Sequence, residues 1–314
     1  MTYSRAISFT LFCLLWIPSV IAQDSLTQTP PAPTPQPAVR PVPFATLSDN
    51  GIISERLFGA LVQGQVGVMR ITGADIQEAR VLFRNHEYPF YDSGVDGWYA
   101  LVVADIDAQP RDYVMSVVVQ QSNGTLTTLS DSVTITAAGF IRQIFELPPN
   151  LAFLTEPEVE RNEYARIDAL TADITPQRYW TADSWTLPMS SGYSARFGQY
   201  RILNDVVQTR HTGWDQSAPV GTPVSTIMDG VVIYADTLDI RGNYVLIDHG
   251  WGVYSGYAHF SQFNVQAGQT VQQGAIIGLS GNTGRSNGPH LHWEILVNGE
   301  WIDGVAFLEM WLPS

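Results

Sequence analysis

The chain has 314 residues, of which 45% are hydrophobic, so it is long enough for two domains that each bury a core. Its formal net charge is −14, and all 16 of its basic residues are arginines. An acidic chain without a basic stripe cannot neutralise phosphates, which argues against nucleic acid and anionic membrane surfaces as partners.

Residues 1–22 are typical of a secretory signal peptide. Arg5 precedes an apolar run from Ala6 to Ile21, and Val20 and Ala22 occupy the small-residue positions of a signal-peptidase site. An uncleaved membrane anchor is the alternative, but the run is shorter than the ~20 apolar residues that span a bilayer. We therefore expect a secreted protein of the cell envelope, periplasmic or extracellular, with no integral membrane segment after signal cleavage.

The chain has a single cysteine, Cys13, and it lies inside this apolar run. The mature chain would then contain no thiol, which excludes disulfides, thiolate zinc ligands and cysteine nucleophiles. Any metal would be held by imidazole and carboxylate groups.

Residues 23–50 are predicted to be a proline-rich linker. The prolines between Thr29 and Pro43 favour an extended polyproline II conformation and oppose a packed helix. This segment is interpreted as a semi-rigid spacer between the envelope and the first domain.

Residues 51–145 are predicted to form an immunoglobulin-like β-sandwich. Short β-rich runs are bounded by glycine, proline, asparagine or aspartate, and Asn123-Gly124 indicates a two-residue hairpin turn. The region has one histidine, His86, which we interpret as a surface contact of the adjacent Glu87. We expect no catalysis in this domain.

Residues 146–188 are predicted to be a connector with a short helix. Thr155 could cap the helix, and Pro157 would lie in its first turn. Four glutamates follow near the helix start, where the helix macrodipole favours anions. We interpret them on that basis rather than as a metal cluster: they are Glu156, Glu158, Glu160 and Glu163.

Residues 189–314 are predicted to be the functional domain, because they hold five of the six histidines. These occur in the segments RHTGWD, IDHGWG, GYAHF and GPHLHWEI, and they are His211, His249, His259, His290 and His292. The DHGWG segment reads as a strand end and turn, so His249 is interpreted as a local hydrogen-bond partner outside the site.

The spacing within two of these segments indicates a metal site. Alternate side chains share one face of a strand, so His290 and His292 should point to the same side. Gly213 lets the backbone fold tightly enough for His211 and Asp215 to approach one ion. Two histidines and one carboxylate would suit catalytic zinc, which takes three protein ligands and leaves a fourth position for water. A carboxylate two residues beyond His292, that of Glu294, could orient a ligand imidazole.

Over about Ser194 to Asp303 the segments HTGWD, YAHF, VQAGQTVQQGAIIGLSGNTG and GPHLHWEI resemble the lysostaphin- and LytM-type zinc metallopeptidases. The resemblance implies an antiparallel β-sheet peptidase domain in which His211, Asp215 and His292 bind Zn²⁺. It also implies that His290 and His259 face the substrate. We expect His290 to be the base and His259 to stabilise the oxyanion.

The resemblance predicts a secreted zinc endopeptidase that hydrolyses peptide bonds of peptidoglycan stems or cross-bridges. The N-terminal domain would position the enzyme by binding the wall or an envelope protein. The glycine-rich loop from Gly281 to Gly288 would form one wall of a narrow cleft.

Two other functions are alternatives to catalysis: a zinc-free activator of a separate wall amidase, and an envelope-binding module. All five family positions are filled, which favours the enzyme. A latent enzyme, with an upstream residue in the fourth zinc position, is a further alternative.

Overall fold

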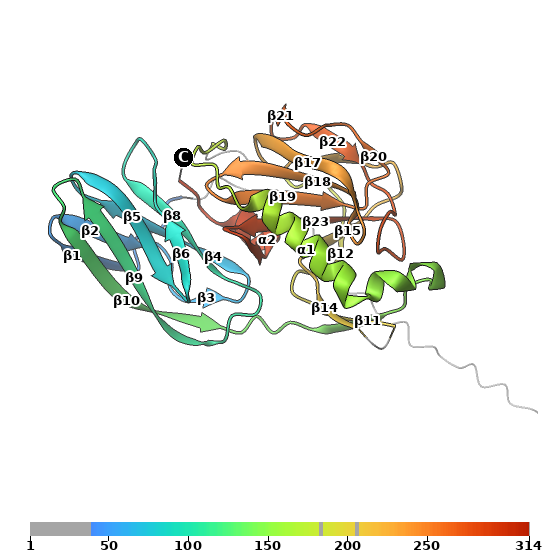
Figure 1. The fold of residues 1–314 in the computed structure, drawn as a ribbon, viewed down its shortest axis with the longest axis horizontal. Helices are drawn as coiled ribbons and strands as arrows, with labels where there is room; N and C mark the ends of the chain where they lie inside the picture. The colour runs from blue at the N-terminus through green and yellow to red at the C-terminus, as the bar shows by residue number, and fades with distance from the viewer. Residues whose placement is uncertain (1–38, 182–184, 205–206, 314) are drawn as a thin grey trace, which may run out of the picture. The chain divides into compact units, whose positions relative to one another are not determined.

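The computed structural model describes residues 39–313 apart from 182–184 and 205–206. The predicted signal peptide, Cys13 and the first part of the predicted linker, residues 23–38, lie outside the described residues. Among the residues that are described, no helix is long and apolar enough to cross a membrane. The expectation of a mainly β protein is confirmed (Figure 1).

Ten strands between Ala45 and Thr136 form two five-stranded sheets (Figure 1). They are β1 (Ala45–Asp49), β2 (Ile52–Arg56), β3 (Leu61–Val62), β4 (Gln65–Thr72), β5 (Ile76–Phe83), β6 (His86–Pro89), β7 (Tyr91–Asp92), β8 (Trp98–Ala104), β9 (Arg111–Gln121) and β10 (Leu126–Thr136). The strand orders are β1-β2-β4-β8-β7 and β3-β10-β9-β5-β6. Buried side chains of both sheets, such as Val102 and Val119, belong to one apolar cluster, so the inner faces pack on each other.

The first strand lies inside the residues predicted to be linker. β1 pairs with β2 along its whole length, from Ala45 opposite Arg56 to Asp49 opposite Ile52. The two residues between them, Asn50 and Gly51, both have positive φ (49° and 75°), as a two-residue hairpin turn requires. The sheet region therefore begins before residue 51, because Asn50-Gly51 is a turn within it rather than its boundary.

The turn at Asn123-Gly124 joins β9 to β10 as an antiparallel hairpin, as predicted, but its loop is longer than two residues. Gly124 donates from its amide to the carbonyl of Gln121 and has φ 84°. Gln121 in turn donates to the carbonyl of Thr125. This is a turn followed by a glycine in the left-handed region, the usual geometry of a three-residue hairpin loop.

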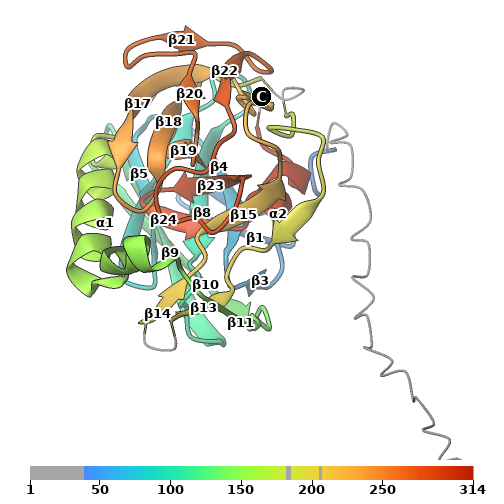
Figure 2. The same ribbon diagram turned by 90° about the vertical axis from the view of Figure 1, so that its right-hand side faces the viewer.

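The connector contains β11 (Arg142–Phe145), a 3₁₀ helix η1 (Pro149–Thr155) and α1 (Pro157–Thr171). Pro157 opens α1 as predicted, whereas the predicted cap at Thr155 is wrong. The Thr155 hydroxyl donates to the carbonyl of Ala152 at the end of η1, and Glu156 precedes α1 without a side-chain cap. α1 runs beside the strands of the C-terminal sheet (Figure 2).

The C-terminal region is built on an eight-stranded sheet with the order β12-β15-β23-β19-β18-β17-β21 and with β24 paired to β23. Its other elements are a three-stranded sheet β16-β22-β20, the hairpin β13-β14 that pairs with β11, and α2. The bounds are β12 (Tyr193–Ala195), β13 (Tyr200–Leu203), β14 (Val207–Arg210), β15 (Gly213–Ser217), β16 (Pro223–Ser225), β17 (Gly230–Leu238), β18 (Gly242–Gly250), β19 (Val253–Ala258), β20 (Gln262–Phe263), β21 (Thr270–Val271), β22 (Ile276–Leu279), β23 (His290–Val297), β24 (Glu300–Ile302) and α2 (Gly304–Glu309). The pairs of the large sheet are antiparallel, which is the arrangement predicted for this region.

Candidate metal centre and active site

The middle of the large sheet brings three predicted ligands together. β15 and β23 are antiparallel neighbours with Asp215 opposite His292, and His211 lies two residues before β15. A Cβ atom on Gly213 would lie 2.2 Å from the carbonyl oxygen of Trp293, so only glycine allows this close pairing. The alternation of β23 also places His290 on the side of His292, as predicted.

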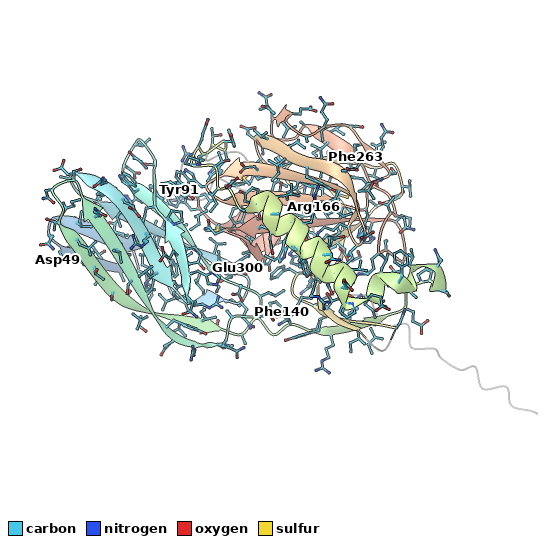
Figure 3. The ribbon with its side chains drawn as sticks, viewed as in Figure 1. Asp49, Tyr91, Phe140, Arg166, Phe263 and Glu300 are labelled. Carbon is cyan, nitrogen blue, oxygen red and sulfur yellow. The ribbon has the colours of Figure 1, made fainter. Side chains whose placement is uncertain are left out.

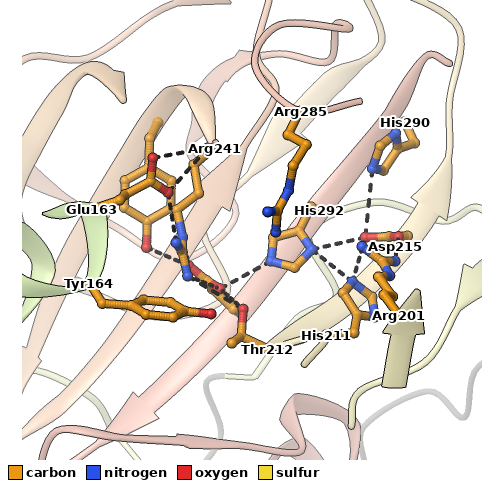
Figure 4. Close-up of polar contacts among 12 residues, drawn as sticks. Glu163, Tyr164, Arg201, His211, Thr212, Asp215, Arg241, Arg285, His290 and His292 are labelled. Atoms are coloured by element: carbon orange, nitrogen blue, oxygen red, sulfur yellow. Dashed lines mark hydrogen bonds and ion pairs between the residues drawn. The ribbon is translucent and has the colours of Figure 1, made fainter. Parts of the chain in front are cut away.

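The ligand atoms of these residues form a tight triangle. Nε2 of His211, Oδ1 of Asp215 and Nδ1 of His292 are each 2.9 Å from the other two (Figure 4). All three side chains are buried, and their ligand atoms lie close enough together to hold one metal ion.

Neighbouring groups set which ring nitrogens carry protons. Nδ1 of His211 can donate only to the backbone carbonyl of Arg196, at 2.6 Å, and Nε2 of His292 only to the carboxylate of Glu294, at 3.0 Å. The other nitrogen of each ring then presents a lone pair, and the two lone pairs face each other and a carboxylate. This donor set fits a cation such as zinc, which bonds to nitrogen and oxygen at about 2 Å and prefers a hydrogen-bonded histidine ligand.

The charges around the triangle keep two of the groups in the forms that bind metal. Burial, followed by the nearby Arg201 guanidinium, lowers the pKa of His211 to about 4, so its ring is neutral at pH 7. Burial alone would raise the pKa of Asp215, but His211 and Arg201 hold it well below its usual value. Arg201, from β13, donates to Oδ2 of Asp215 and leaves Oδ1 to face the histidines.

His292 behaves differently from His211. Burial would lower its pKa, but the hydrogen bonds to Asp215 and Glu294 raise it. Protons therefore compete with a metal for this ring more strongly than for His211, which couples metal affinity to pH.

The two predicted substrate-facing histidines lie beside the triangle. The centres of the His259 and His290 rings are 4.7 Å apart, and the His259 ring is 6.0 Å from that of His292. Nδ1 of His259 contacts the carbonyl of Thr283 at 2.7 Å, and Nδ1 of His290 contacts that of Gly288 at 2.8 Å. With Nδ1 donating in both rings, each Nε2 is free to accept a proton.

His259 has a backbone conformation that side chains rarely adopt. It follows β19 with φ 64°, and its amide donates to the carbonyl of Arg241 at 2.8 Å. Burial, then the neighbouring His290 and His292, hold its pKa well below the usual value, so the ring is neutral. A strained backbone that presents a neutral imidazole beside a metal triad is typical of a functional residue.

Glu294 is held by a buried network that the sequence analysis did not find. Arg241 donates from Nε to Oε1 of Glu294 at 2.6 Å and from Nη2 to Oε2 at 2.9 Å. The hydroxyls of Thr212 and Tyr244 donate to the same carboxylate at 2.6 and 2.8 Å. Burial would raise the pKa of Glu294, but Arg241 and His292 outweigh it and keep the carboxylate ionised.

The network continues into α1 through Glu163 (Figure 4). Nη1 of Arg241 lies 2.8 Å from Oε1 of Glu163, and Oε2 of Glu163 accepts from the amide of Ile240 at 2.6 Å. The interpretation of Glu163 as a residue placed for the helix dipole is therefore wrong, because it is buried and ion-paired. A signal was present in the sequence: Glu163 lies four residues before the buried Ile167, on the same helix face.

His249 and His86 lie outside the triangle. His249 is buried, with Nδ1 2.7 Å from the carbonyl of Asp229 and Nε2 2.7 Å from the hydroxyl of Ser255. His86 faces Glu300 of β24 at 3.6 Å, whereas its chain neighbour Glu87 pairs with Arg80.

A second group of residues with metal-ligand atoms surrounds His86. Atoms of His86, Asp105 and Glu300 lie within 4.8 Å of one another, and Glu300 is labelled in Figure 3. Arg84 pairs with Asp105 at 2.6 Å, so a cation already compensates part of the negative charge. We assign no metal to this group.

Comparison with known proteins agrees with the geometry. Residues 209–304 match the model of Peptidase family M23. Peptidoglycan DD-endopeptidase ShyA of Vibrio cholerae serotype O1 is 47% identical over 131 residues, which are 41% of this chain and 29% of ShyA. DD-carboxypeptidase/endopeptidase Mpg of Neisseria meningitidis serogroup B is 47% identical over 96 residues, which are 31% of this chain and 22% of Mpg. The chain thus matches less than a third of the length of these relatives.

A solved structure extends the likeness beyond the matched residues. A crystal structure assigned to peptidase M23 from Pseudomonas aeruginosa aligns with a TM-score of 0.58 and 23% identity, over 80% of this chain and 96% of that one. At this identity the likeness concerns the fold alone.

Proposed function

We propose, from the premise that the chain contains a Peptidase M23 domain at residues 209–304, that it is a zinc metalloendopeptidase hydrolysing peptide bonds of peptidoglycan stems or cross-bridges. One observation carries the proposal. Two imidazole nitrogens and a carboxylate oxygen lie 2.9 Å from one another, and the imidazole rings of His259 and His290 lie beside them. The DD-endopeptidase names of the curated relatives support the substrate class.

In this proposal His211, Asp215 and His292 hold the zinc, and the remaining residues handle protons. Bound zinc supplies a Lewis acid and lowers the pKa of a bound water to about 7. His290 accepts the proton of the attacking water at Nε2, while its Nδ1 bond to Gly288 fixes the ring. The carboxylate of Asp215, 3.7 Å from Nε2 of His290, stabilises the positive charge that the ring gains.

His259 was predicted to stabilise the oxyanion, which needs a proton on its Nε2. Its Nδ1 contact with Thr283 and its depressed pKa favour the opposite form, a neutral ring that accepts at Nε2. We therefore propose that His259 accepts a hydrogen bond from the water or from a substrate N–H.

The parts of the chain outside this domain keep their predicted roles as proposals. Residues 1–22 would direct export to the cell envelope, and residues 23–50 would act as a spacer. The sheets within 51–145, which we propose to be an immunoglobulin-like sandwich, would position the enzyme on the wall or on an envelope protein. Residues 146–188 would connect them to the peptidase domain, 189–314.

The alternatives of an amidase activator or an envelope-binding module need a site without zinc or without catalysis. The complete donor set and the two rings beside it favour the enzyme. For a latent enzyme an upstream side chain would have to reach the metal; besides the ligand His211, the described upstream side chain that contacts the Asp215 carboxylate is that of Arg201, and a guanidinium is not a metal ligand.

The test combines metal content with product analysis. The purified mature protein should hold about one zinc per chain and release new amino termini from peptidoglycan. His290→Ala should keep zinc and lose activity by roughly 10²-fold or more, while His86→Ala should keep both. A wild type that binds zinc but releases no peptide, with or without residues 23–145, would overturn the proposal in favour of the binding module.

A further inference from the structure

A polar cavity opens directly onto the candidate active site. Its volume is about 250 Å³, and Asp215 and His290 form part of its wall. The rest of the wall includes two arginines, Arg201 and Arg285, together with serine and asparagine side chains. Arg201 is paired with Asp215, so the buried guanidinium of Arg285 is the charged group of the wall that needs an explanation.

Arg285 is fixed in place but only partly neutralised. It lies in the loop before β23, and its amide donates to the carbonyl of Ile240 at 2.8 Å, which anchors the loop beside the buried network. Its side chain is 10% exposed. Within the part of the chain that the structure describes, its guanidinium has two long contacts, 3.5 Å to a carboxylate oxygen of Glu160 and 3.3 Å to the carbonyl of Leu154.

The carboxylate of Glu160 is shared among several donors, so it offsets the burial of Arg285 only in part. The hydroxyls of Tyr164 and Thr209 donate to the same oxygen that faces Arg285. Burial, the largest influence, lowers the pKa of Arg285, and Glu160 and Tyr164 oppose this effect. Arg201 lowers the pKa further, which means that the two cations repel each other. An anion in the cavity would relieve this repulsion.

The chemistry of the wall favours a carboxylate. A guanidinium matches the two oxygens of a carboxylate with two parallel hydrogen bonds, and serine hydroxyls can complete them. The loop wall is preorganised, since the Ser286 hydroxyl lies 2.6 Å from Oδ1 of Asn282 and 2.8 Å from the carbonyl of Gly288 and can donate to either. Arg201, Arg285 and His290 all line this one cavity.

We propose that Arg285, with Arg201 beside it, forms a subsite for a free carboxylate of the substrate peptide close to the scissile bond. The inference rests on the proposed function, and it narrows the substrate to peptides whose carboxylate near the cleaved bond is not amidated. Arg285 is then a specificity-determining residue: the negative charge of the substrate offsets a cation that the fold leaves poorly paired.

The test compares two substrates and matched variants. The substrates are a cross-linked muropeptide dimer with free stem carboxylates and the same dimer with those carboxylates converted to amides. The variants are Arg285→Gln, Arg285→Lys and the control Arg142→Gln, an exposed arginine on β11, the strand that contributes Gln143 to the cavity. Melting temperature and zinc content are measured for each.

The wild type and Arg142→Gln should cleave the free-carboxylate dimer with a kcat/KM about 10-fold or more above that of the amidated dimer. Arg285→Gln should reduce this preference to near one, mainly by raising KM for the free-carboxylate dimer, and should leave the amidated dimer unaffected. Arg285→Lys, which keeps the charge but not the paired donors, should fall between and serves if Arg285→Gln does not fold. Equal loss on both dimers, or a wild type without preference, would overturn the inference while leaving the endopeptidase intact.

A binding measurement separates this inference from the proposed function. Calorimetry with the free stem tetrapeptide and its amidated form needs no cleavage. If no dimer is cleaved but the free tetrapeptide still binds about 10-fold tighter through Arg285, the proposed function fails and the subsite stands. Equal binding of the two tetrapeptides to the wild type counts against the subsite.

Discussion

The strands β10 of the N-terminal sheets and β23 of the peptidase domain differ in what lies on their two faces, although side chains alternate between the faces in both. Along β10 exposed and buried residues largely alternate, with Val133 and Ile135 in the core and the serines and threonines other than Thr127 outside. Nearly all of β23 is buried, although its second face carries His292 and Glu294. A polar strand face that lies inside the protein must have partners, and in β23 those partners form the site.

The largest effect on activity is expected at the three metal-ligand residues. Each region has an aspartate that is paired with an arginine, so the two aspartates can be compared. Asp215 accepts from Arg201, and Asp131 of β10 accepts from Arg56 at 2.7 Å. Asp215→Ala should abolish zinc binding and lower peptidoglycan hydrolysis by about 10³-fold or more, because a ligand is lost. Asp131→Ala should affect the melting temperature alone. Zinc content and activity of the two folded variants are the measurements, and equal activity loss in both would break the comparison.

Replacing a paired arginine should lower the free energy of unfolding more in the peptidase domain than in the N-terminal sheets. Arg241 has a side chain 5% exposed and pairs with Glu163 and Glu294, whose side chains are 1% and 0% exposed. Arg241→Met leaves both carboxylates buried without a cation and should lower the free energy of unfolding by about 3–5 kcal/mol.

The matched change in the N-terminal sheets is Arg56→Met. Its partner Asp131 has a side chain 27% exposed, so water can solvate the carboxylate that is left. We expect a loss of about 2 kcal/mol. Urea denaturation of both variants measures the difference, and an equal loss would mean that burial of the partners does not decide the cost.

A smaller effect is expected from the far end of the buried network. Glu163→Gln keeps the shape of the side chain but weakens the hold on Arg241, and through it the orientation of Glu294 and His292. Zinc affinity should fall by about 10-fold, as is typical when a group that orients a ligand is changed. Glu158→Gln, on the exposed side of the same helix, is the control.

Chelator competition measures this affinity without any substrate. Glu294→Gln should have a larger effect of the same kind, since its carboxylate contacts His292 directly. If Glu163→Gln lowers the melting temperature but leaves zinc affinity unchanged, the residue serves the packing of α1 alone.

The sequence was sufficient for the features that depend on short spacings. The four-residue separation of His211 and Asp215 and the alternation of His290 and His292 are local, and the structure does bring these side chains together with His259. The mainly β fold and the peptidase domain were predictable for the same reason, because strand periodicity and the family's segments can both be recognised in short continuous stretches of sequence.

The network behind the site could not be predicted in this way. Glu163 and Arg241 are 78 residues apart in the chain, and each resembles an ordinary surface charge until α1 covers the sheet. The early strand β1 was missed for a local reason, since Asn50-Gly51 gives a turn signal that does not say on which side the domain begins. Interactions over long sequence separations thus limit what periodicity can reveal, and buried ion pairs belong to that class.

The smallest expected effect concerns the group between β24 and the N-terminal sheets. Burial, followed by the charge of Asp105, raises the pKa of Glu300 to about 7, from an ordinary value near 4.5. Asp107 and Asp168 act in the same direction, Arg84 opposes them, and His86 also faces the carboxylate. Between pH 4.5 and pH 7 the folded protein therefore binds more protons at this position than the unfolded chain.

Stability from Glu300 is thus fully present at low pH and is lost as the pH rises through about 7. The glutamine of Glu300→Gln stays neutral throughout. The melting temperature of the variant should therefore rise relative to that of the wild type, by a few degrees or less, as the pH increases from 5 to 8. The comparison is made in the wild-type background and again with His86→Ala, which removes the imidazole that faces the carboxylate. A difference between the proteins that does not change with pH would mean that Glu300 is charged in the folded state across this range, and that the junction, unlike the metal site, is wet enough to solvate it.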